Sequence, residues 1–159
     1  KLFDVCLCDN KGECTVCGSS ECDKTAADRG QCLAFQSFMK EQAFWLDDYA
    51  LYSAIKKQQQ QKSWFDWPDD LKKRKRKALE QAQKDLRYEI FYYQFEQFVF
   101  FSQWHSLKNY ANERGVYLFG DLPIFVAHDS ADVWAQRQFF KLNKNGESEV
   151  VAGVPPDYF

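Results

Sequence analysis

An acid that stands just after an apolar run is the residue of this sequence best placed for chemistry. Asp121 comes at the end of the apolar stretch Val116–Phe119, and a second apolar stretch, Ile124–Val126, begins after one proline. Such an acid is hydrogen-bonded, paired with a cation or turned toward a ligand, because burying a lone charge is costly. In open α/β folds and in (β/α)8 barrels, ligands bind at the carboxyl ends of strands. Asp121 is therefore a candidate ligand contact, with a structural acid that holds its own loop as the alternative.

The end of the sequence carries a second acid beside two aromatic rings, namely Asp157, Tyr158 and Phe159. Two prolines precede them, so this segment is expected to be a loop that holds these side chains out. Aromatic residues make up 18% of the sequence. That share fits either a large aromatic core, which composition alone favours, or a cleft whose rings stack on sugars, bases or other flat ligands.

Helices are predicted for most of the sequence before this acid and its strand. Apolar residues recur at three- and four-residue spacing over 33–55, and the polar run Gln58–Gln61 ends that helix. Pro68, followed by two aspartates, is typical of a helix start. The helical pattern then continues to Arg114, which is long for one helix of a globular domain, so a break is expected near 84–89.

The end of this helical region leads into the predicted strand. Residues 91–101 are apolar on nearly every side, which predicts a helix buried on several sides, and Gly115 is a fitting C-terminal cap. Residues 116–119 predict a buried strand, and 129–132 predict a turn and N-cap for a short helix. The dipeptide Asn145-Gly146 between apolar runs predicts a β-hairpin. Together these elements make one β/α unit with a decorated loop at the carboxyl end of its strand.

The charge balance argues against a nucleic-acid partner. Net charge is −2, so no general attraction to nucleic acid is expected. The basic run Lys72–Lys77 could serve in nuclear localisation or phosphate binding. We favour a solvated helix surface with Leu71, Leu79 and Ala82 turned inward, because the run sits inside a predicted helix.

All the cysteines lie in residues 1–32, a segment with little apolar periodicity: Cys6, Cys8, Cys14, Cys17, Cys22 and Cys32. The C-x-C and C-x-x-C spacings suit a metal site, whereas an even number of cysteines in a loop-rich segment suits disulfides. Unbonded thiols on an insertion are the third interpretation. Neither His105 nor His128 is near in sequence, and no metal or cofactor is assigned.

The length of 159 residues suits one domain with a real core. No apolar run approaches the roughly 20 residues that span a bilayer, and no signal peptide is recognisable because Asp4 interrupts a short apolar start. We therefore expect a cytoplasmic protein without membrane contact. The sequence starts at Lys1 rather than at methionine, so we also expect a piece of a longer protein.

Six motifs occur in a fixed order: Phe44–Leu51, Phe100–Trp104, Tyr110–Gly115, Gly120–Ala127, Asp129–Ala135 and Val151–Phe159. In these motifs the sequence resembles the amylomaltase family, the bacterial and plastid 4-α-glucanotransferases or disproportionating enzymes. The resemblance runs from Leu33 to Phe159 and leaves out residues 1–32.

The resemblance implies an α/β fold, a partial (β/α)8 TIM barrel of the alpha-amylase type with an inserted, mostly helical subdomain. The helical subdomain would span about 33–90, and the β/α unit with its substrate loops about 91–159. The implied activity transfers α-1,4-glucan segments between maltooligosaccharides by a retaining mechanism, with a carboxylate nucleophile and a carboxylic acid/base. The implied partners are maltooligosaccharides and glucans derived from glycogen or starch, with no cofactor.

By the same resemblance, Asp121 would end the third barrel strand and line the sugar cleft. Asp157, Tyr158 and Phe159 would begin a mobile loop that covers the bound glucan and shields the covalent intermediate from water. The catalytic carboxylates of the family come from later strands, so none is assigned here and the chain alone is expected to be inactive. The alternative is a non-enzymatic, cysteine-rich interaction module, held by disulfides or zinc on a helical stalk.

Overall fold

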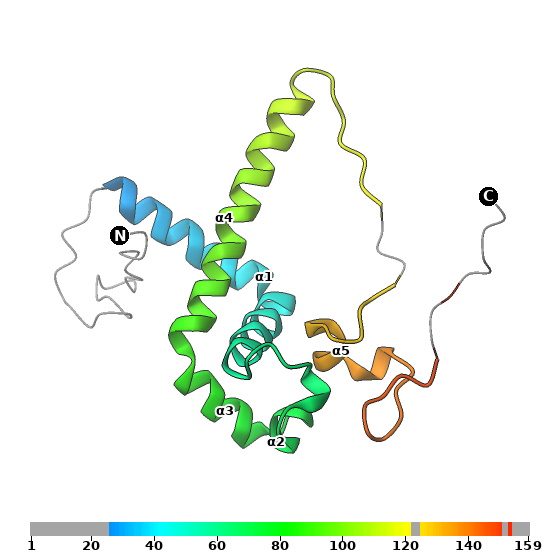
Figure 1. Ribbon diagram of the computed structural model, residues 1–159. Coiled ribbons are helices and arrows are strands. Elements are labelled where there is room, and N and C mark those ends of the chain that lie inside the picture. Colours follow the sequence, from blue (N-terminus) through cyan, green and yellow to red (C-terminus); the bar gives the residue numbers. More distant parts are fainter. Residues whose placement is uncertain (1–25, 122–124, 151–152, 154–159) are drawn as a thin grey trace.

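The computed structural model of the chain describes residues 26–121, 125–150 and 153, and this part is mostly helical (Figure 1). In chain order the elements are α1 (Ala26–Gln58), η1 (Trp64–Asp66), α2 (Asp69–Lys72), α3 (Arg76–Asp85), α4 (Arg87–Asn112), α5 (Ala131–Ala135) and η2 (Arg137–Phe139). The two long helices α1 and α4 pack against each other, and α1 also contacts α5. The predicted first helix is confirmed, and it begins early enough to include Cys32, which is buried.

Backbone geometry confirms two predicted helix boundaries in the first half of the chain. α1 ends at Gln58, and the next turn places Gln60 and Gln61 at positive φ angles of 57° and 64°. α3 and α4 are separated at Leu86, inside the expected break at 84–89. The second helical region therefore contains α2, α3 and α4, and the predicted break separates the last two of these helices.

Gly115 closes the far end of α4 as the sequence predicts, although the helix itself ends at Asn112 rather than at Arg114. Gly115 has a φ of 74°, and its N–H donates to the carbonyl of Asn112 at 3.0 Å. The N–H of Val116 donates to the carbonyl of Ala111, also at 3.0 Å. This pair of bonds needs a left-handed residue after the helix, which glycine adopts without steric cost.

The basic run Lys72–Lys77 does not lie inside one helix, which corrects the prediction made from its pattern. α2 ends and α3 begins within the run, and Arg74 between them has a φ of 52°. A left-handed conformation costs a non-glycine residue about 1–2 kcal/mol. The tertiary contacts of Arg74 offset this cost, because its guanidinium pairs with Asp48 at 2.6 Å and lies over the ring of Trp134 at 4.1 Å.

Two aromatic clusters hold the helices together. Phe35 of α1 is fully buried, with its ring 5.3, 5.5 and 5.3 Å from three phenylalanine rings of α4. The second cluster surrounds Tyr52, whose ring lies 5.3 Å from that of Trp67 and 5.8 Å from that of Trp134. Because Trp134 is on α5, the second cluster joins α1 to the segment that follows Asp121.

The strand predicted at 116–119 is not formed among the described residues. These residues are extended without pairing, and the side chains of Tyr117 and Phe119 are 81% and 102% exposed. A strand needs a neighbour to bond its backbone N–H and C=O groups, and the described residues supply none to this segment. Figure 1 shows it leaving the end of α4 apart from the other described elements.

The hairpin predicted around Asn145-Gly146 is present in a minimal form. Leu142 and Ser148 form an antiparallel bridge, and the N–H of Asn143 donates to the carbonyl of Glu147 at 2.9 Å. Gly146 has a φ of 86°, as a tight turn with this dipeptide requires.

Burial of α4 on several sides is also not observed in the described part of the chain. None of its residues is fully buried, and Phe100 and Tyr110 are each 56% exposed. One face packs on α1, while Leu107 and Tyr110 in its last turns are largely exposed. No helix in the described ranges is long and apolar enough to cross a membrane.

Candidate functional site

Of the four predicted substrate contacts, only Asp121 lies in the described part of the chain. Asp121 is exposed and sits on the extended segment between α4 and α5. Asp157, Tyr158 and Phe159 lie outside the described residues. The role of all four residues in sugar binding therefore stays a prediction. The described part of the candidate site consists of the residues that anchor the segment after Asp121.

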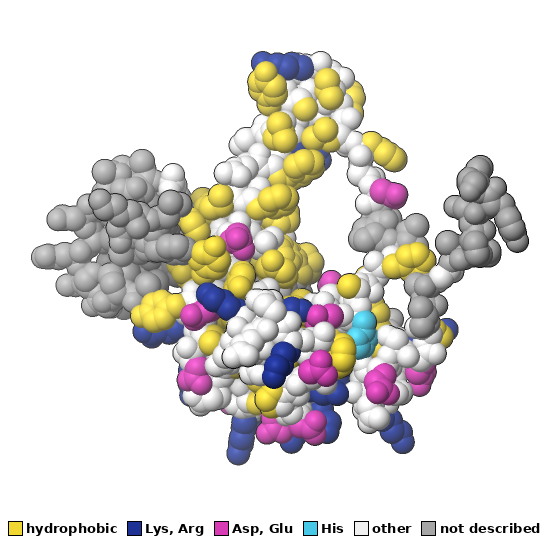
Figure 2. All heavy atoms as spheres, in the orientation of Figure 1, with side chains coloured by type: hydrophobic (Ala, Val, Ile, Leu, Met, Phe, Trp, Pro, Cys, Tyr) yellow, Lys and Arg dark blue, Asp and Glu magenta, His cyan; other side chains and the backbone are white. Residues whose placement is uncertain are grey.

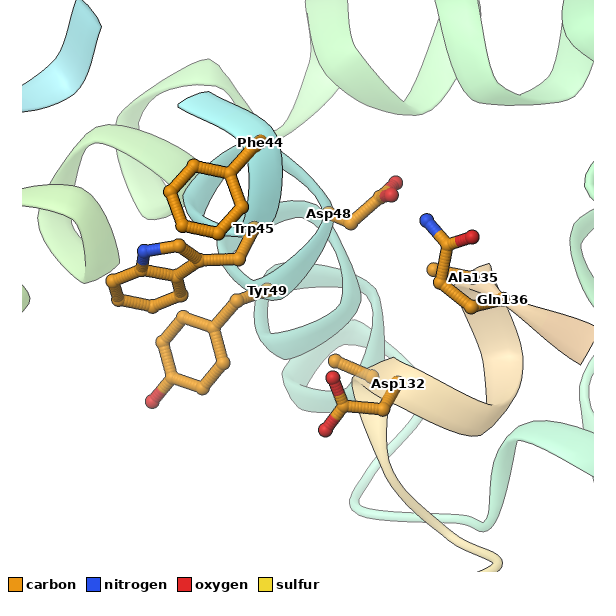
Figure 3. A pocket seen from close by; sticks show the side chains of 8 residues that line it. Phe44, Trp45, Asp48, Tyr49, Asp132, Ala135 and Gln136 are labelled. Carbon is orange, nitrogen blue, oxygen red and sulfur yellow. The ribbon is translucent and has the colours of Figure 1, made fainter. Parts of the chain in front are cut away.

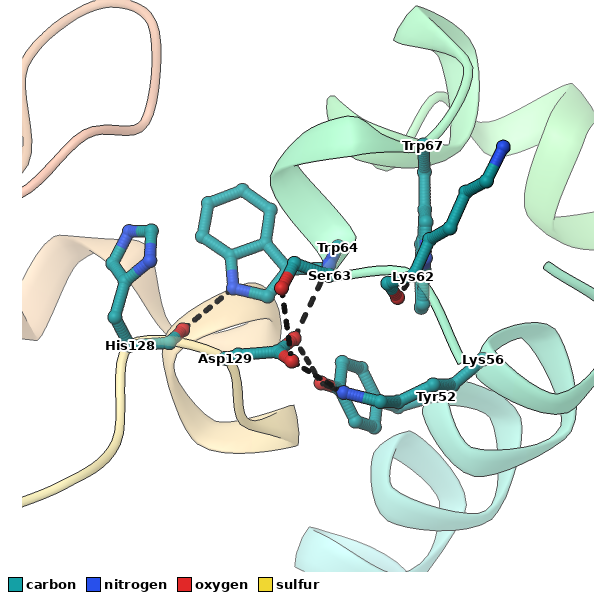
Figure 4. A network of polar contacts seen from close by, with 8 residues as sticks. All are labelled: Tyr52, Lys56, Lys62, Ser63, Trp64, Trp67, His128 and Asp129. Atoms are coloured by element: carbon teal, nitrogen blue, oxygen red, sulfur yellow. Dashed lines mark hydrogen bonds and ion pairs between the residues drawn. The ribbon is translucent and has the colours of Figure 1, made fainter. Parts of the chain in front are cut away.

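Asp129 is the main anchor of that segment (Figure 4). Its Oδ1 accepts from the Tyr52 hydroxyl at 2.8 Å and from the backbone N–H of Trp64 at 3.2 Å. Its Oδ2 accepts from the Ser63 hydroxyl at 3.1 Å and pairs with the ammonium of Lys56. Four donors from α1 and the following turn therefore converge on one carboxylate.

The electrostatics of this network make Asp129 a structural acid. Burial alone would raise the pKa of Asp129, but the hydrogen bonds from Lys56, Tyr52, Trp64 and Ser63 outweigh burial and lower it. Burial and the bond to this carboxylate together raise the pKa of the Tyr52 phenol. Asp129 is thus ionised at neutral pH with its acceptor positions occupied, which suits positioning and does not suit proton transfer.

In the loop 129–132, Ser130 caps α5 and Asp129 bonds to α1. Ser130 is the N-cap of α5, since its side-chain oxygen accepts from the N–H of Val133 at 3.3 Å. The predicted N-cap is therefore confirmed for Ser130, whereas Asp129 bonds to α1 instead. The N-cap was readable from local sequence, but the partners of Asp129 lie 65 to 77 residues away.

His128 is part of the same anchor and is half-buried. Its backbone carbonyl accepts from the Trp64 indole N–H at 2.6 Å, and its Nε2 lies 2.8 Å from the carbonyl oxygen of Gly146. Its ring is 5.1 Å from the rings of both Trp64 and Phe65. His105 is exposed on α4. The ring of His105 lies 6.2 Å from that of Phe101 on the same helix.

The basic run is occupied by contacts within the chain. Lys72 donates to the carbonyl of Phe65 at 2.7 Å, and Arg74 pairs with Asp48. Two exposed lysines of the run pair with acids of α2 at 2.6 Å each, namely Lys73 with Asp69 and Lys75 with Asp70. These cations shape the turn between α2 and α3, which supports a structural role for the run.

The structure also contains a pocket between α1 and α5 that sequence reasoning missed (Figure 3). It is a cavity of about 120 Å³. The lining residues are Phe44, Trp45, Asp48, Tyr49, Ala131, Asp132, Ala135 and Gln136. The signal that could have found it is the spacing of aromatic and acidic residues over 44–49, which places them on neighbouring turns of one helix.

The part of the chain that is described holds no group of three or more metal-ligating side chains arranged for an ion. The cysteines from Cys6 to Cys22 lie outside it. Their metal, disulfide and thiol interpretations therefore stay open.

By fold, the chain is similar to part of a solved amylomaltase. An amylomaltase from Streptococcus agalactiae, solved in complex with acarbose, matches 85% of this chain with a TM-score of 0.76 and 33% sequence identity. The match covers 27% of that enzyme. This match supports an amylomaltase-type fold for the chain. The described residues by themselves are helical and form no barrel strand.

The family follows from the sequence. Residues 15–159 match the 4-alpha-glucanotransferase family, glycoside hydrolase family 77. The 4-alpha-glucanotransferases of Thermus thermophilus and Aquifex aeolicus are 48% and 45% identical to it over 126 and 124 residues. These matches cover 79% and 78% of the chain.

The chain belongs to the 4-alpha-glucanotransferase family, which confirms the resemblance seen in its motifs. It spans about a quarter of the length of the curated relatives it matches. The family match begins at residue 15, inside the cysteine-rich segment and before the first motif at Phe44.

Proposed function

We propose that this chain is part of a 4-alpha-glucanotransferase, which moves α-1,4-glucan segments between maltooligosaccharides by a retaining mechanism. The observation that carries the proposal is 48% identity over 126 residues to a protein of that name. The amylomaltase with a similar fold was solved with acarbose, which supports a sugar ligand. The proposed substrates are maltooligosaccharides and glucans derived from glycogen or starch, and the proposed location is the cytoplasm.

Within such an enzyme, we propose that residues 33–90 form the helical subdomain and 91–159 a β/α unit of a (β/α)8 barrel. Exposed apolar side chains support this assignment, because the last turns of α4 and the segment 116–119 carry Leu107, Tyr110, Tyr117 and Phe119 uncovered. Figure 2 shows hydrophobic side chains gathered along the upper part of α4. Neighbouring barrel strands and helices in a longer protein would cover this surface and pair the segment 116–119 as a strand.

Asp121 is proposed to accept hydrogen bonds from sugar hydroxyls at the carboxyl end of that strand. Tyr158 and Phe159 would stack on the apolar faces of glucose rings, with Asp157 beside them. The anchoring of Asp129 to α1 supports this placement, since it fixes the path of the chain shortly after Asp121.

The reacting carboxylates are proposed to lie outside this chain. A retaining pair needs two carboxyl groups about 5 Å apart across the scissile bond. Two partly buried acids, Asp48 and Asp129, are ion-paired with Arg74 and Lys56 in structural contacts. The isolated chain is therefore proposed to be inactive, and a separate cysteine-rich module is not proposed because the family match begins within that segment.

A hybrid enzyme tests the proposal. The segment of the Thermus thermophilus relative that matches this chain is replaced by the chain, and transfer from maltotriose is measured as glucose and longer glucans. A thermophilic host is suitable because its stability tolerates imperfect new interfaces. Transfer supports the proposal, and a folded hybrid that transfers nothing contradicts it.

A further inference from the structure

The pocket between α1 and α5 combines flat rings with hydrogen-bonding groups. Phe44 and Asp48, and likewise Trp45 and Tyr49, are four residues apart, so each pair lies on neighbouring turns of α1. The rings of Trp45 and Tyr49 are 5.9 Å apart at an angle of 58°. In Figure 3 the three aromatic rings stand together on one side of the pocket.

Phe44 is a large apolar residue that lines this pocket and is nevertheless exposed. Its side chain is 79% exposed, although it stands next to Trp45 in the helix. A phenylalanine at this exposure forgoes the stabilisation of about 1.5–3 kcal/mol that burial of such a side chain gives. An exposed ring at the mouth of a pocket is available to a ligand.

The other side of the pocket is polar. Asp132 lies in the first turn of α5, and Gln136 follows its last residue. Asp48 also lines the pocket, with its Oδ1 bonded to Arg74. Figure 3 shows the Asp132 carboxylate and the Gln136 amide across from the rings. Carboxylate and amide groups accept and donate hydrogen bonds in the pattern that vicinal hydroxyl groups need.

This combination selects among ligand classes. Two carboxylates and a net charge of −2 disfavour phosphates and nucleic acids. The polar rim disfavours a purely apolar ligand, because its groups would lose their hydrogen bonds to water. A pyranose ring presents an apolar C–H face and a rim of hydroxyls, which matches a pocket with aromatic rings on one side and polar groups on the other.

We propose that this pocket binds one glucosyl unit of an α-glucan, through residues other than the predicted contacts Asp121 and Asp157–Phe159. The ring would stack against Phe44 and Trp45, and its hydroxyls would bond to Asp132 and Gln136. The choice of an α-linked glucan rests on the proposed function, whereas the choice of a pyranose rests on the pocket. Such a site would hold a distant part of a long glucan and raise its local concentration.

The test is a titration of the 159-residue chain with maltotriose, followed by the NMR signal of the Trp45 indole N–H. That group donates to Gln42 at 2.8 Å, and Trp45→Phe identifies its signal by removing it. Far-UV circular dichroism first establishes that the chain is helical. If it is not, the same titration is made on the hybrid with the Thermus thermophilus relative, which carries the same pocket.

The expected result is a saturable shift of the Trp45 signal at millimolar maltotriose. Phe44→Ala should weaken binding about tenfold, as loss of one stacked ring does. Asp132→Asn should also weaken it. Phe100→Ala is the matched control, because it removes a ring that is 56% exposed on α4 and does not line the pocket.

Absence of a saturable shift at tens of millimolar maltotriose would overturn the proposal, as would equal effects of Phe44→Ala and Phe100→Ala. Covering of Phe44 by the host in the folded hybrid would likewise overturn it, because a packing contact would then explain the exposed ring. Binding without glucan transfer by the hybrid would leave the pocket standing and remove the proposed function. Glucan transfer by the hybrid without a shift of the Trp45 signal would leave the proposed function standing and overturn the pocket.

Discussion

The carboxylate of Asp129 accepts a hydrogen bond of 2.8 Å from the hydroxyl of Tyr52, which joins two segments 77 residues apart. Lys56 on the same helix pairs with the other carboxylate oxygen. Asp129 therefore fastens the segment after Asp121 to the helical part of the chain.

Removing this carboxylate should destabilise the chain. Asp129→Ala leaves Lys56, Tyr52 and Ser63 without their acceptor in a partly buried site, and we expect a loss of about 2–3 kcal/mol in the free energy of unfolding. The measurement is urea denaturation at neutral pH. Glu80→Gln is the control, since its exposed pair with Arg76 at 3.7 Å should change stability by less than about 0.5 kcal/mol. Equal losses in the two variants would contradict the anchoring role.

The contribution of Asp129 should vanish in acid. Its pKa in the folded chain is lowered below the ordinary value of 3.8, so the stabilisation is present above that value and is lost as the pH falls through the folded-state pKa. Asp129→Asn removes the titrating group. We expect the difference in free energy of unfolding between the parent chain and Asp129→Asn to be smaller near pH 3 than near pH 7. An unchanged difference would show that the charge of Asp129 does not stabilise the fold.

Gly146 should tolerate no side chain. Its φ is 86°, and a Cβ there would lie 2.9 Å from Cη2 of Trp64, a fully buried ring. Gly146→Ala should cost about 1–3 kcal/mol through strain and overpacking. Gly30→Ala is the control in helix α1, where a Cβ meets nothing within 4 Å and alanine should be neutral or stabilising by up to about 1 kcal/mol. Thermal melting compares the two, and a Gly146→Ala variant as stable as the parent would refute the close packing.

Asp121 should matter for sugar and not for folding. In the hybrid, Asp121→Asn is expected to lower kcat/KM for maltotriose about 10- to 100-fold, the value of one hydrogen bond between a charged group and the substrate. Glu113→Gln, at another exposed acid, is the control. The melting temperature should stay unchanged in both variants. A fall in melting temperature with kcat/KM intact would instead assign Asp121 to holding its own loop.

The sequence predicted the features that depend on neighbours along the chain. The end of α1 at Gln58, the break at Leu86 and the cap at Gly115 each follow from residues within one or two helical turns. The N-cap of α5 at Ser130 is equally local. Capping, helix periodicity and glycine conformation are set by short-range sterics and hydrogen bonds, so one sequence is enough to read them.

Features that depend on distant partners were not predictable in the same way. The strand at 116–119 requires paired neighbours, and the described residues provide none to it. The pattern of the basic run predicts one helix, but the helix is interrupted at Arg74. Contacts with Asp48 and Trp134 hold Arg74 in a left-handed conformation. The network at Asp129 and the pocket at Phe44 form only when α1 and the segment around α5 meet, a contact that no local pattern encodes.

The most direct test of the central claim is disproportionation of maltotriose, measured side by side for the hybrid and for the isolated 159-residue chain. If this chain supplies the substrate-facing part of a 4-alpha-glucanotransferase while the reacting carboxylates lie elsewhere, the hybrid will release glucose and form longer glucans, and the isolated chain will do neither. A folded hybrid without transfer, or robust transfer by the isolated chain, would contradict it.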